Sequence, residues 1–323
     1  MNEITFIERN TDRWKEFESL ISSKFEASPD KISELFIQIT DDLAYARTYF
    51  PKSKVAGYLN YLSINVHHKI YKNKKVKSNR FAEFWLLDYP VLVYNSRKYI
   101  YYSLLIFITA IVIGALSSAH DANFVRLILG DQYVNMTLEN IHKGDPMAVY
   151  KQMNPSGMFL AITLNNLWVA FRTAIFGVFL SIGSALSILQ NGIMVGAFQS
   201  FFYQKGLLWE SSLTIFLHGT YELFSIVIAG ASGFVIGSGI IFPESYSRLE
   251  SFKRGVIQGV KLLIGIVPLF IIAAFLEGFI TRLTASPLAI KISIILFSLF
   301  TILFYFFIYP TFITKKLKNY GRN

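Results

Sequence analysis

Long apolar stretches dominate the last two thirds of the chain. Crossing about 30 Å of hydrocarbon takes roughly 20 helical residues. Six apolar stretches reach that length, near residues 99–118, 158–179, 183–203, 212–240, 256–280 and 287–310. We therefore predict about six membrane-spanning helices. The second and third form either a tight hairpin or one broken element, and the fourth is long enough to require tilt, a kink or an interfacial end.

The first 98 residues have a different pattern, with apolar residues at helical spacing among many polar ones. Trp14 and Phe17 mark a first helix, and Pro29 follows a serine as it would at the first position of a second. We predict three or four helices here. The fold class is all-α, a polytopic bundle with a small helical N-terminal region. The expected parts are residues 1–98, the bundle over 99–310 and a basic tail over 311–323.

A basic run followed by aromatic residues precedes the first predicted span. Such a combination is typical of a segment that lies at the level of the lipid headgroups. A solvated basic loop followed by an ordinary helix is the alternative. The residues for which we expect headgroup contact are Lys72, Lys74, Lys75, Lys77, Arg80 and Trp85.

Composition agrees with two different solvents. The 323 residues are 53% hydrophobic and 16% charged, against roughly 45 to 50% and about 25% in a soluble domain. Residues 1–98 hold 28 of the 52 charged side chains. The chain has no cysteine, which excludes disulfides, cysteine-ligated metal and thiol catalysis.

The net charge of +10 reports membrane topology rather than nucleic acid binding. Lysine and arginine accumulate in segments kept on the cytoplasmic side. Both ends of the chain are basic, so we expect both in the cytoplasm, with the protein in a bacterial inner membrane. Residues 119–157 then lie outside and residues 241–255 inside. We expect contact with the lipid bilayer and no nucleic acid partner.

Several polar residues fall within the predicted spans, where they are costly. An ionisable side chain near the bilayer centre costs at least about 2.5 kcal/mol, so it usually faces the protein interior, pairs or lines water. We therefore expect a polar core that serves as a ligand or ion site or as a structural network. Its members are Asn165, Asn166, Arg172, Asn191, His218, Glu222 and Glu277.

His218 and Glu222 are four residues apart, so a helix presents both on one face. An imidazole and a carboxylate could hold a metal or carry protons. The zinc-protease pattern has a second histidine, which is missing here, so we expect no metal and no cofactor. A network with the asparagines or Arg172 is the structural interpretation, and a direct Arg172–Glu222 pair is a hypothesis. Glu277 is the obvious candidate for a third ligand.

Glycines in the spans favour close helix packing. Pairs of small residues four apart let helix backbones approach each other in membranes. The positions that we expect at helix contacts are Gly192, Gly196, Gly219, Gly233, Gly237, Gly255 and Gly259.

The order of these polar blocks resembles the stage II sporulation protein M family. The carrying residues are the Asn165-Asn166 pair, the Asn191-Gly192 pair, and His218-Gly219 with Glu222. The resemblance covers most of residues 85–310. It implies an envelope membrane protein that recruits or positions partners and is not itself a hydrolase. The extra N-terminal residues, as in the longer relatives, imply a role outside sporulation.

Three functions follow as hypotheses. The first is a non-enzymatic scaffold in bacterial cell-envelope assembly or remodelling, with other membrane or envelope proteins as partners and a homo-oligomer left open. The second is a transporter or transport subunit with a polar site at the midplane. The third is an intramembrane metalloenzyme. The chain carries no phosphate-binding loop or nucleophile elbow, so it does not drive transport with ATP by itself.

Overall fold

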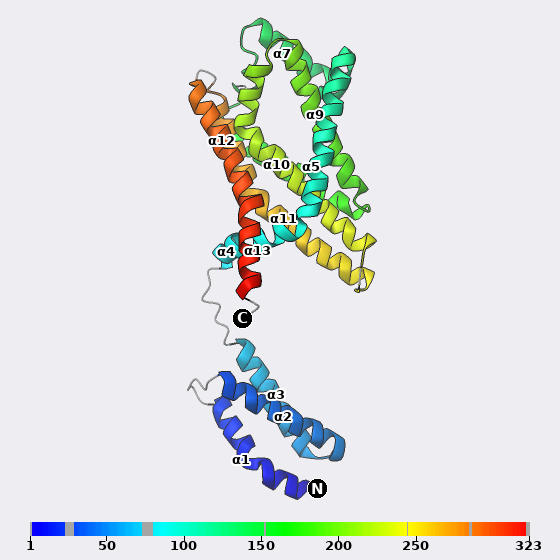
Figure 1. Cartoon of the computed structure of the whole chain (residues 1–323), viewed down its shortest axis with the longest axis vertical. Helices are drawn as coiled ribbons and strands as arrows, with labels where there is room; N and C mark the ends of the chain where they lie inside the picture. Colours follow the sequence, from blue (N-terminus) through cyan, green and yellow to red (C-terminus); the bar gives the residue numbers. More distant parts are fainter. Residues whose placement is uncertain are drawn as a thin grey trace. The chain divides into compact units, whose positions relative to one another are not determined.

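The computed structural model describes residues 2–22, 29–72, 80–151, 153–243, 245–283 and 286–320, drawn in Figure 1. It gives the backbone alone at 20–22, 29–33, 65–72, 122 and 320. Contacts divide the chain into two compact units, Met1–Arg80 and Phe81–Asn323. Helices and turns make up the described residues, with no strand among them. The predicted all-α class is confirmed.

The N-terminal unit contains α1 (Glu3–Ser22), α2 (Pro29–Tyr49) and α3 (Lys54–Lys72). The indole Nε1 of Trp14 donates a hydrogen bond of 2.8 Å to Asp42, which also pairs with Arg13 at 2.5 Å. These polar contacts lie beside a closed apolar core, so the unit has a core of its own. The buried core residues are Phe6, Trp14, Phe17, Leu35, Ile39, Leu43, Ala46, Leu59 and Leu62.

The second unit holds six helical segments, among the described residues, that are long and apolar enough to cross a membrane. The first joins α4 (Arg80–Glu83), η1 (Phe84–Asp88) and α5 (Tyr89–His120). The others are α8 (Pro155–Ile175) with η3 (Phe176–Val178), α9 (Ile182–Gln204), α10 (Leu208–Ile241), α11 (Arg248–Phe275) with η4 (Leu276–Thr281), and α12 (Leu288–Leu303) with η5 (Phe304–Ile308) and α13 (Tyr309–Tyr320). The predicted helical membrane bundle is confirmed.

The helix that contains the first predicted span begins well before that span. It runs over Arg80–His120, whereas the prediction placed a span near 99–118. Arg97 and Lys98 interrupt the apolar pattern but are exposed, so the helix continues through them. The compact N-terminal unit correspondingly ends at Arg80 rather than at residue 98.

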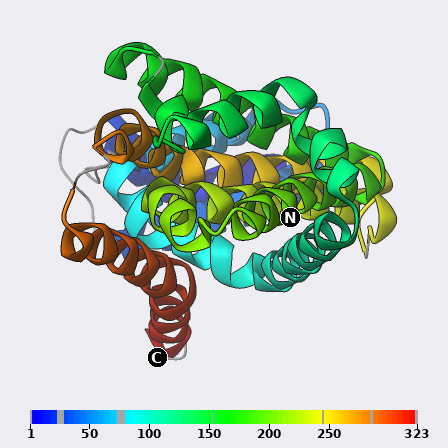
Figure 2. The same ribbon diagram turned by 90° about the horizontal axis from the view of Figure 1, so that it is seen from above.

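The helix α10 lies at the centre of the membrane unit. In its most apolar stretch 78% of the residues are buried in the protein, against 17% in the last crossing. Figure 2 looks along the bundle and shows α10 (yellow-green) among the other helices. Polar side chains on α10 therefore face protein rather than lipid, which makes this helix the natural carrier of a buried site.

Glycines allow the closest helix contacts. A Cβ at Gly196 would lie 2.1 Å from the Ile111 oxygen of α5, and one at Gly177 would lie 2.1 Å from the Gly233 oxygen of α10. The other predicted packing positions Gly192, Gly237, Gly255 and Gly259 also face a neighbouring segment. Gly219 differs, because a Cβ there would meet only side chains of its own helix, at 3.3 Å and beyond.

The second and third crossings form a tight hairpin, which settles the alternative of one broken element. The turn between α8 and α9 places Leu180 and Ser181 at φ of 53° and 68°. Left-handed backbone is costly for residues with a side chain. Ser181 packs against Gly237, where a Cβ would lie 2.5 Å from the Ser181 nitrogen. The missing side chain on α10 thus makes room for the turn.

A helical cap connects the first two crossings. It consists of α6 (Ala122–Leu129), α7 (Asp131–His142) and η2 (Ala148–Lys151). An apolar cluster attaches the cap to the end of α9. Its buried members are Val125, Val134, Met147, Phe201 and Phe202. The cap corresponds to the segment that we predict outside the membrane.

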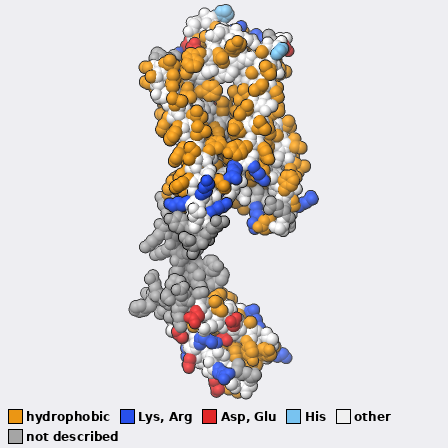
Figure 3. All heavy atoms as spheres, viewed as in Figure 1, with side chains coloured by type: hydrophobic (Ala, Val, Ile, Leu, Met, Phe, Trp, Pro, Cys, Tyr) orange, Lys and Arg blue, Asp and Glu red, His pale blue; other side chains and the backbone are white. Residues whose placement is uncertain are grey.

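Lysine and arginine gather at the end of the membrane unit opposite the cap, below the apolar side chains in Figure 3. Arg97, Arg254 and Lys318 are exposed there, as is Arg80. The Trp85 ring is half-buried, and its carbonyl oxygen accepts a hydrogen bond of 2.7 Å from the Tyr305 hydroxyl. Headgroup contact stays a prediction. The remaining candidates lie outside the described side chains: Lys72, Lys74, Lys75 and Lys77.

Candidate functional site

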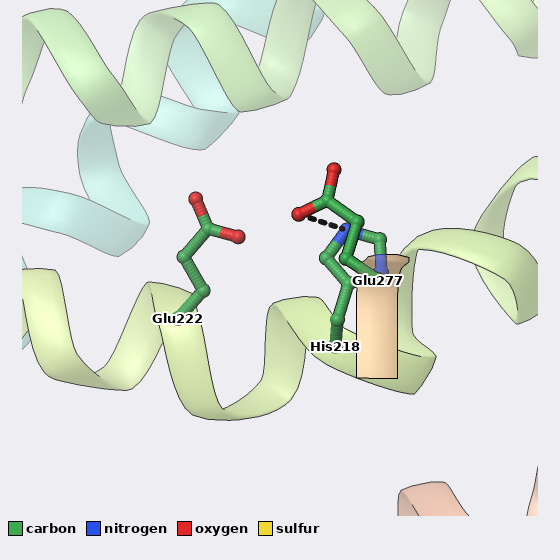
Figure 4. Close-up of side chains that lie close together, drawn as sticks. All are labelled: His218, Glu222 and Glu277. Atoms are coloured by element: carbon green, nitrogen blue, oxygen red, sulfur yellow. Dashed lines mark ion pairs between the residues drawn. The ribbon is translucent and has the colours of Figure 1, made fainter. Parts of the chain in front are cut away.

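His218 and Glu222 share one face of α10, as the four-residue spacing predicts. Figure 4 shows both side chains rising from this helix, with Glu277 reaching them from a neighbouring segment. His218 is 4% exposed. One ligand atom from each of the three residues lies within 4.8 Å of the others. The Nε2 atom of His218 is 3.8 Å from Oε2 of Glu277.

The local backbone of η4 places Glu277. This segment, Leu276–Thr281, is a π-helix that follows α11 without a break. A π-turn holds one residue more than an α-turn and recurs at functional sites. The extra residue changes which side chains face α10. For this reason the spacing along α11 does not reveal that Glu277 and Thr281 both reach His218.

A chain of hydrogen bonds fixes the orientation of the His218 ring. Nδ1 of His218 lies 3.1 Å from Oγ1 of Thr281, and that hydroxyl donates to the carbonyl oxygen of Leu276 at 3.1 Å. A threonine hydroxyl has a single proton. Since the proton is used on Leu276, the hydroxyl accepts from Nδ1–H. In the neutral ring, Nε2 is then an unprotonated acceptor directed at the carboxylate of Glu277.

A cavity of about 340 Å³ adjoins the three residues. The cap contributes Tyr133 and Tyr150 to its lining, and the Tyr150 ring meets the His218 ring edge-on with 5.7 Å between centroids. Burial, followed by the nearby charge of Glu277, raises the pKa of the Tyr150 phenol well above its ordinary value. Burial also raises the pKa of Tyr133 to about 12. Both phenols stay protonated at physiological pH and can donate into the cavity.

A second cavity, of about 260 Å³, also borders Glu222 and is lined by the predicted polar residues of α8 and α9. Asn165 and Asn191 are each hydrogen-bonded, to Asn166 and to the Ser187 carbonyl. Asn166 approaches Glu222. Its Nδ2 nevertheless makes no hydrogen bond of good geometry to any part of the protein that the structure describes. An unpartnered buried donor of this kind is costly unless a ligand or water accepts from it.

A third hollow, of about 410 Å³, continues the row to the turn between α8 and α9. It shares Arg172 and Gln190 with the second cavity, as the second shares Glu222 and Met194 with the first. Neighbouring hollows therefore share lining residues from the cap to the turn between α8 and α9, where the third hollow is lined largely by exposed apolar side chains such as Phe179 and Ile182.

The structure does not contain the direct Arg172–Glu222 ion pair that was our hypothesis. Arg172 and Glu222 line the same cavity, but no ion pair joins them in the described part of the chain, and Nε of Arg172 is buried without a hydrogen-bond partner there. Of the partners expected for Glu222 in a structural network, the structure places Asn166 beside it and not Arg172.

Sequence reasoning missed two contributors to the site, Tyr150 and Thr281. Tyr150 and Thr281 carry no signal of their own, because a tyrosine in a loop and a threonine near a helix end are common. Gln199 lines the first cavity, and its buried Nε2 lacks a described partner. Gly219, expected at a helix contact, also lines this cavity. Its missing side chain widens the hollow beside His218.

Comparison with known families gives two matches. Residues 103–282 match the family model of Stage II sporulation protein M, and this covers more than half of the chain. Residues 4–72 match a separate domain of unknown function, DUF8413. Among curated proteins and among solved structures, the comparison found no match. The first match spans α5 to η4 and therefore includes every residue of the polar core.

Proposed function

This chain belongs to the stage II sporulation protein M family, and we propose that it is a multi-pass membrane transport protein or the membrane subunit of a transport complex. The single observation that supports this is the row of three hollows that meet at Glu222 and Arg172. Binding sites of transporters lie near the bilayer midplane, where polar groups converge. The proposal assigns the chain no chemical reaction.

The cost of the polar core favours this role over packing alone. Charged side chains inside membranes are expensive and usually mark substrate or ion pathways. A scaffold could fill the same space with apolar side chains, and replacing buried ionic groups in that way is often neutral or stabilising. The described structure instead leaves Asn166, Arg172 and Gln199 with unpartnered buried donors beside hollows. These donors suit a lining that binds solvent or solute.

Water access to the second cavity is the first test. The chain has no cysteine, so a single introduced cysteine is the only thiol of the protein that can react with the reagent. We expect Asn166→Cys, in lipid vesicles or cells, to react with a small membrane-impermeant thiol reagent at least about tenfold faster than Ala170→Cys, because water solvates thiolate formation. The control is matched: Ala170 lies one turn along α8 and is 3% exposed, against 7% for Asn166, but it lines none of the three hollows.

If Asn166→Cys is too unstable to purify, Val169→Cys tests the same wall, since Val169 also lines the second cavity. Reaction rates for both cavity positions as low as that of Ala170→Cys would contradict the proposal. A lipid-facing position, Leu164, at 67% exposed, shows the rate for a thiol in contact with acyl chains.

A second candidate function is the envelope scaffold. It is favoured by the N-terminal unit, which has a separate core and a separate family match. We propose that this unit recruits membrane or envelope partners from the cytoplasmic side of a bacterial inner membrane. The basic end of the membrane unit supports that orientation, with both termini in the cytoplasm.

Deleting residues 1–80 tests the recruiting role. The two units have separate cores, so we expect the shortened protein to insert and to keep its thermal midpoint within about 2 °C, since additivity holds for independent parts. Chemical crosslinking in cells followed by purification of the chain should then recover fewer envelope proteins than with the full chain. An unchanged set of crosslinked partners would count against a docking role for this unit.

A further inference from the structure

Three acceptors face one another at the centre of the site. Nδ1 of His218 donates to Thr281, so Nε2 offers a lone pair, and the nearest charged atom is Oε2 of Glu277 at 3.8 Å. A carboxylate oxygen of Glu222 completes the group, in which one ligand atom from each residue lies within 4.8 Å of the other two. If both carboxyl groups are ionised, these lone pairs and negative charges repel in a buried setting, where electrostatic interactions are strong, and either a shared proton or a bound cation relieves the repulsion. A cation among them turns this repulsion into attraction.

We propose that His218, Glu222 and Glu277 bind a divalent transition metal ion of the zinc type. Zinc binds imidazole nitrogen and carboxylate oxygen, and its sites with an open position are held by three protein ligands. Calcium and magnesium prefer oxygen ligands alone, and the imidazole favours zinc and its neighbours. The two carboxylates match the charge of a divalent ion, which removes an uncompensated buried charge.

The spacing of the ligand atoms suits such an ion after a small adjustment. Zinc bonds to nitrogen and oxygen are about 2.0 to 2.2 Å, which separates neighbouring tetrahedral ligand atoms by about 3.3 to 3.6 Å. Nε2 of His218 and Oε2 of Glu277 are already 3.8 Å apart. The widest spacing in the group is within 4.8 Å, and the flexible side chain of Glu222 borders two cavities that give it room to close the difference.

The surroundings of the three residues resemble those of built metal sites. A metal-binding histidine commonly donates its other ring nitrogen to an oxygen that fixes the ring, and Thr281 has this role toward His218. Thr281 is a positioning residue, since it touches the ring and not the ion. The cavity beside the cluster leaves the fourth coordination position for water or a solute.

This inference rests on the cavities that carry the proposed function, but it requires no transport. The test uses the full chain in lipid nanodiscs, dialysed against buffered Zn²⁺, with bound zinc measured by elemental analysis. We expect about one tightly bound zinc per chain, as for a three-ligand site. Glu277→Gln is expected to weaken this binding at least about 100-fold, and Thr281→Val about 10- to 100-fold as a positioning residue.

Glu250→Gln is the matched control. Glu250 lies on α11, the helix that η4 continues, and it pairs with Arg254 at an exposed position outside the cluster. It should bind zinc as the unaltered chain does. Replacing Zn²⁺ with Co²⁺ provides a second readout, since coordination by nitrogen and oxygen gives visible absorption bands that Glu277→Gln should abolish. Equal zinc content in the unaltered chain and in Glu277→Gln would overturn the metal site. A result in which neither protein binds zinc would overturn it as well.

The outcomes separate this inference from the proposed function. If Asn166→Cys reacts rapidly but zinc does not bind, the metal site is wrong and the water-filled path stands. If zinc binds at these residues and the cavity thiols stay inert, the path is wrong and the metal site stands. The two proposals therefore fail independently.

Discussion

Leucine in place of Gly196 is expected to leave no folded protein in the membrane fraction. The Cβ of any side chain at this position would lie 2.1 Å from the Ile111 oxygen and 2.7 Å from the Ala115 nitrogen. Both are backbone atoms of α5, so no change of rotamer relieves the overlap. Overpacking of a core typically costs about 1 to 3 kcal/mol, and separation of two helices along their contact should exceed that range.

The measurement is the yield of monodisperse protein after detergent extraction, followed by thermal unfolding of what remains. Gly219→Ala is the matched control on the central helix, because its Cβ would meet only Ile215 and Leu223 of the same helix, at 3.3 and 4.0 Å. Alanine is preferred over glycine in helices by up to about 1 kcal/mol, so this variant should be as stable as the unaltered chain or slightly more so. Normal yield of Gly196→Leu would refute the close α5–α9 contact.

The helices and much of the polar core follow from the sequence. Apolar length alone predicts the spans, and four-residue spacing alone places His218 beside Glu222. Close packing at Gly192 and Gly196 was also predictable, because small residues four apart recur at helix contacts in membranes. These features depend on local periodicity, which one sequence displays fully.

Features that depend on contacts between distant segments could not be obtained in this way. Charge alone makes Glu277 a candidate third ligand, but its contact with His218 depends on the π-helix η4 and on packing across the bundle, and no local pattern predicts either. The same holds for the Thr281 hydroxyl that orients the imidazole. Charge alone favours an ion pair between Arg172 and Glu222, yet in the structure the two residues line the same cavity without pairing. The expectation of no metal came from the absence of a second histidine in the predicted spans.

The central claim is that the acceptors of the cluster are arranged for a cation and not for packing. Glu277→Gln tests it, because the amide supplies a donor for Nε2 of His218 while the shape of the side chain is kept. In zinc-free protein we expect this variant to be more stable, by about 1.5 to 3 kcal/mol, the range of a hydrogen bond involving a charged group. A functional site of this kind lowers stability in exchange for binding.

The most direct measurement is therefore the thermal midpoint of the unaltered chain and of Glu277→Gln in nanodiscs, each with and without Zn²⁺. Ligand at 100 times its Kd stabilises a folded protein by about 2.7 kcal/mol. The account predicts that Glu277→Gln raises the midpoint without zinc and removes the increase that zinc gives the unaltered chain. A lower midpoint for Glu277→Gln without zinc, together with no effect of zinc on either protein, would show a structural cluster and contradict the account.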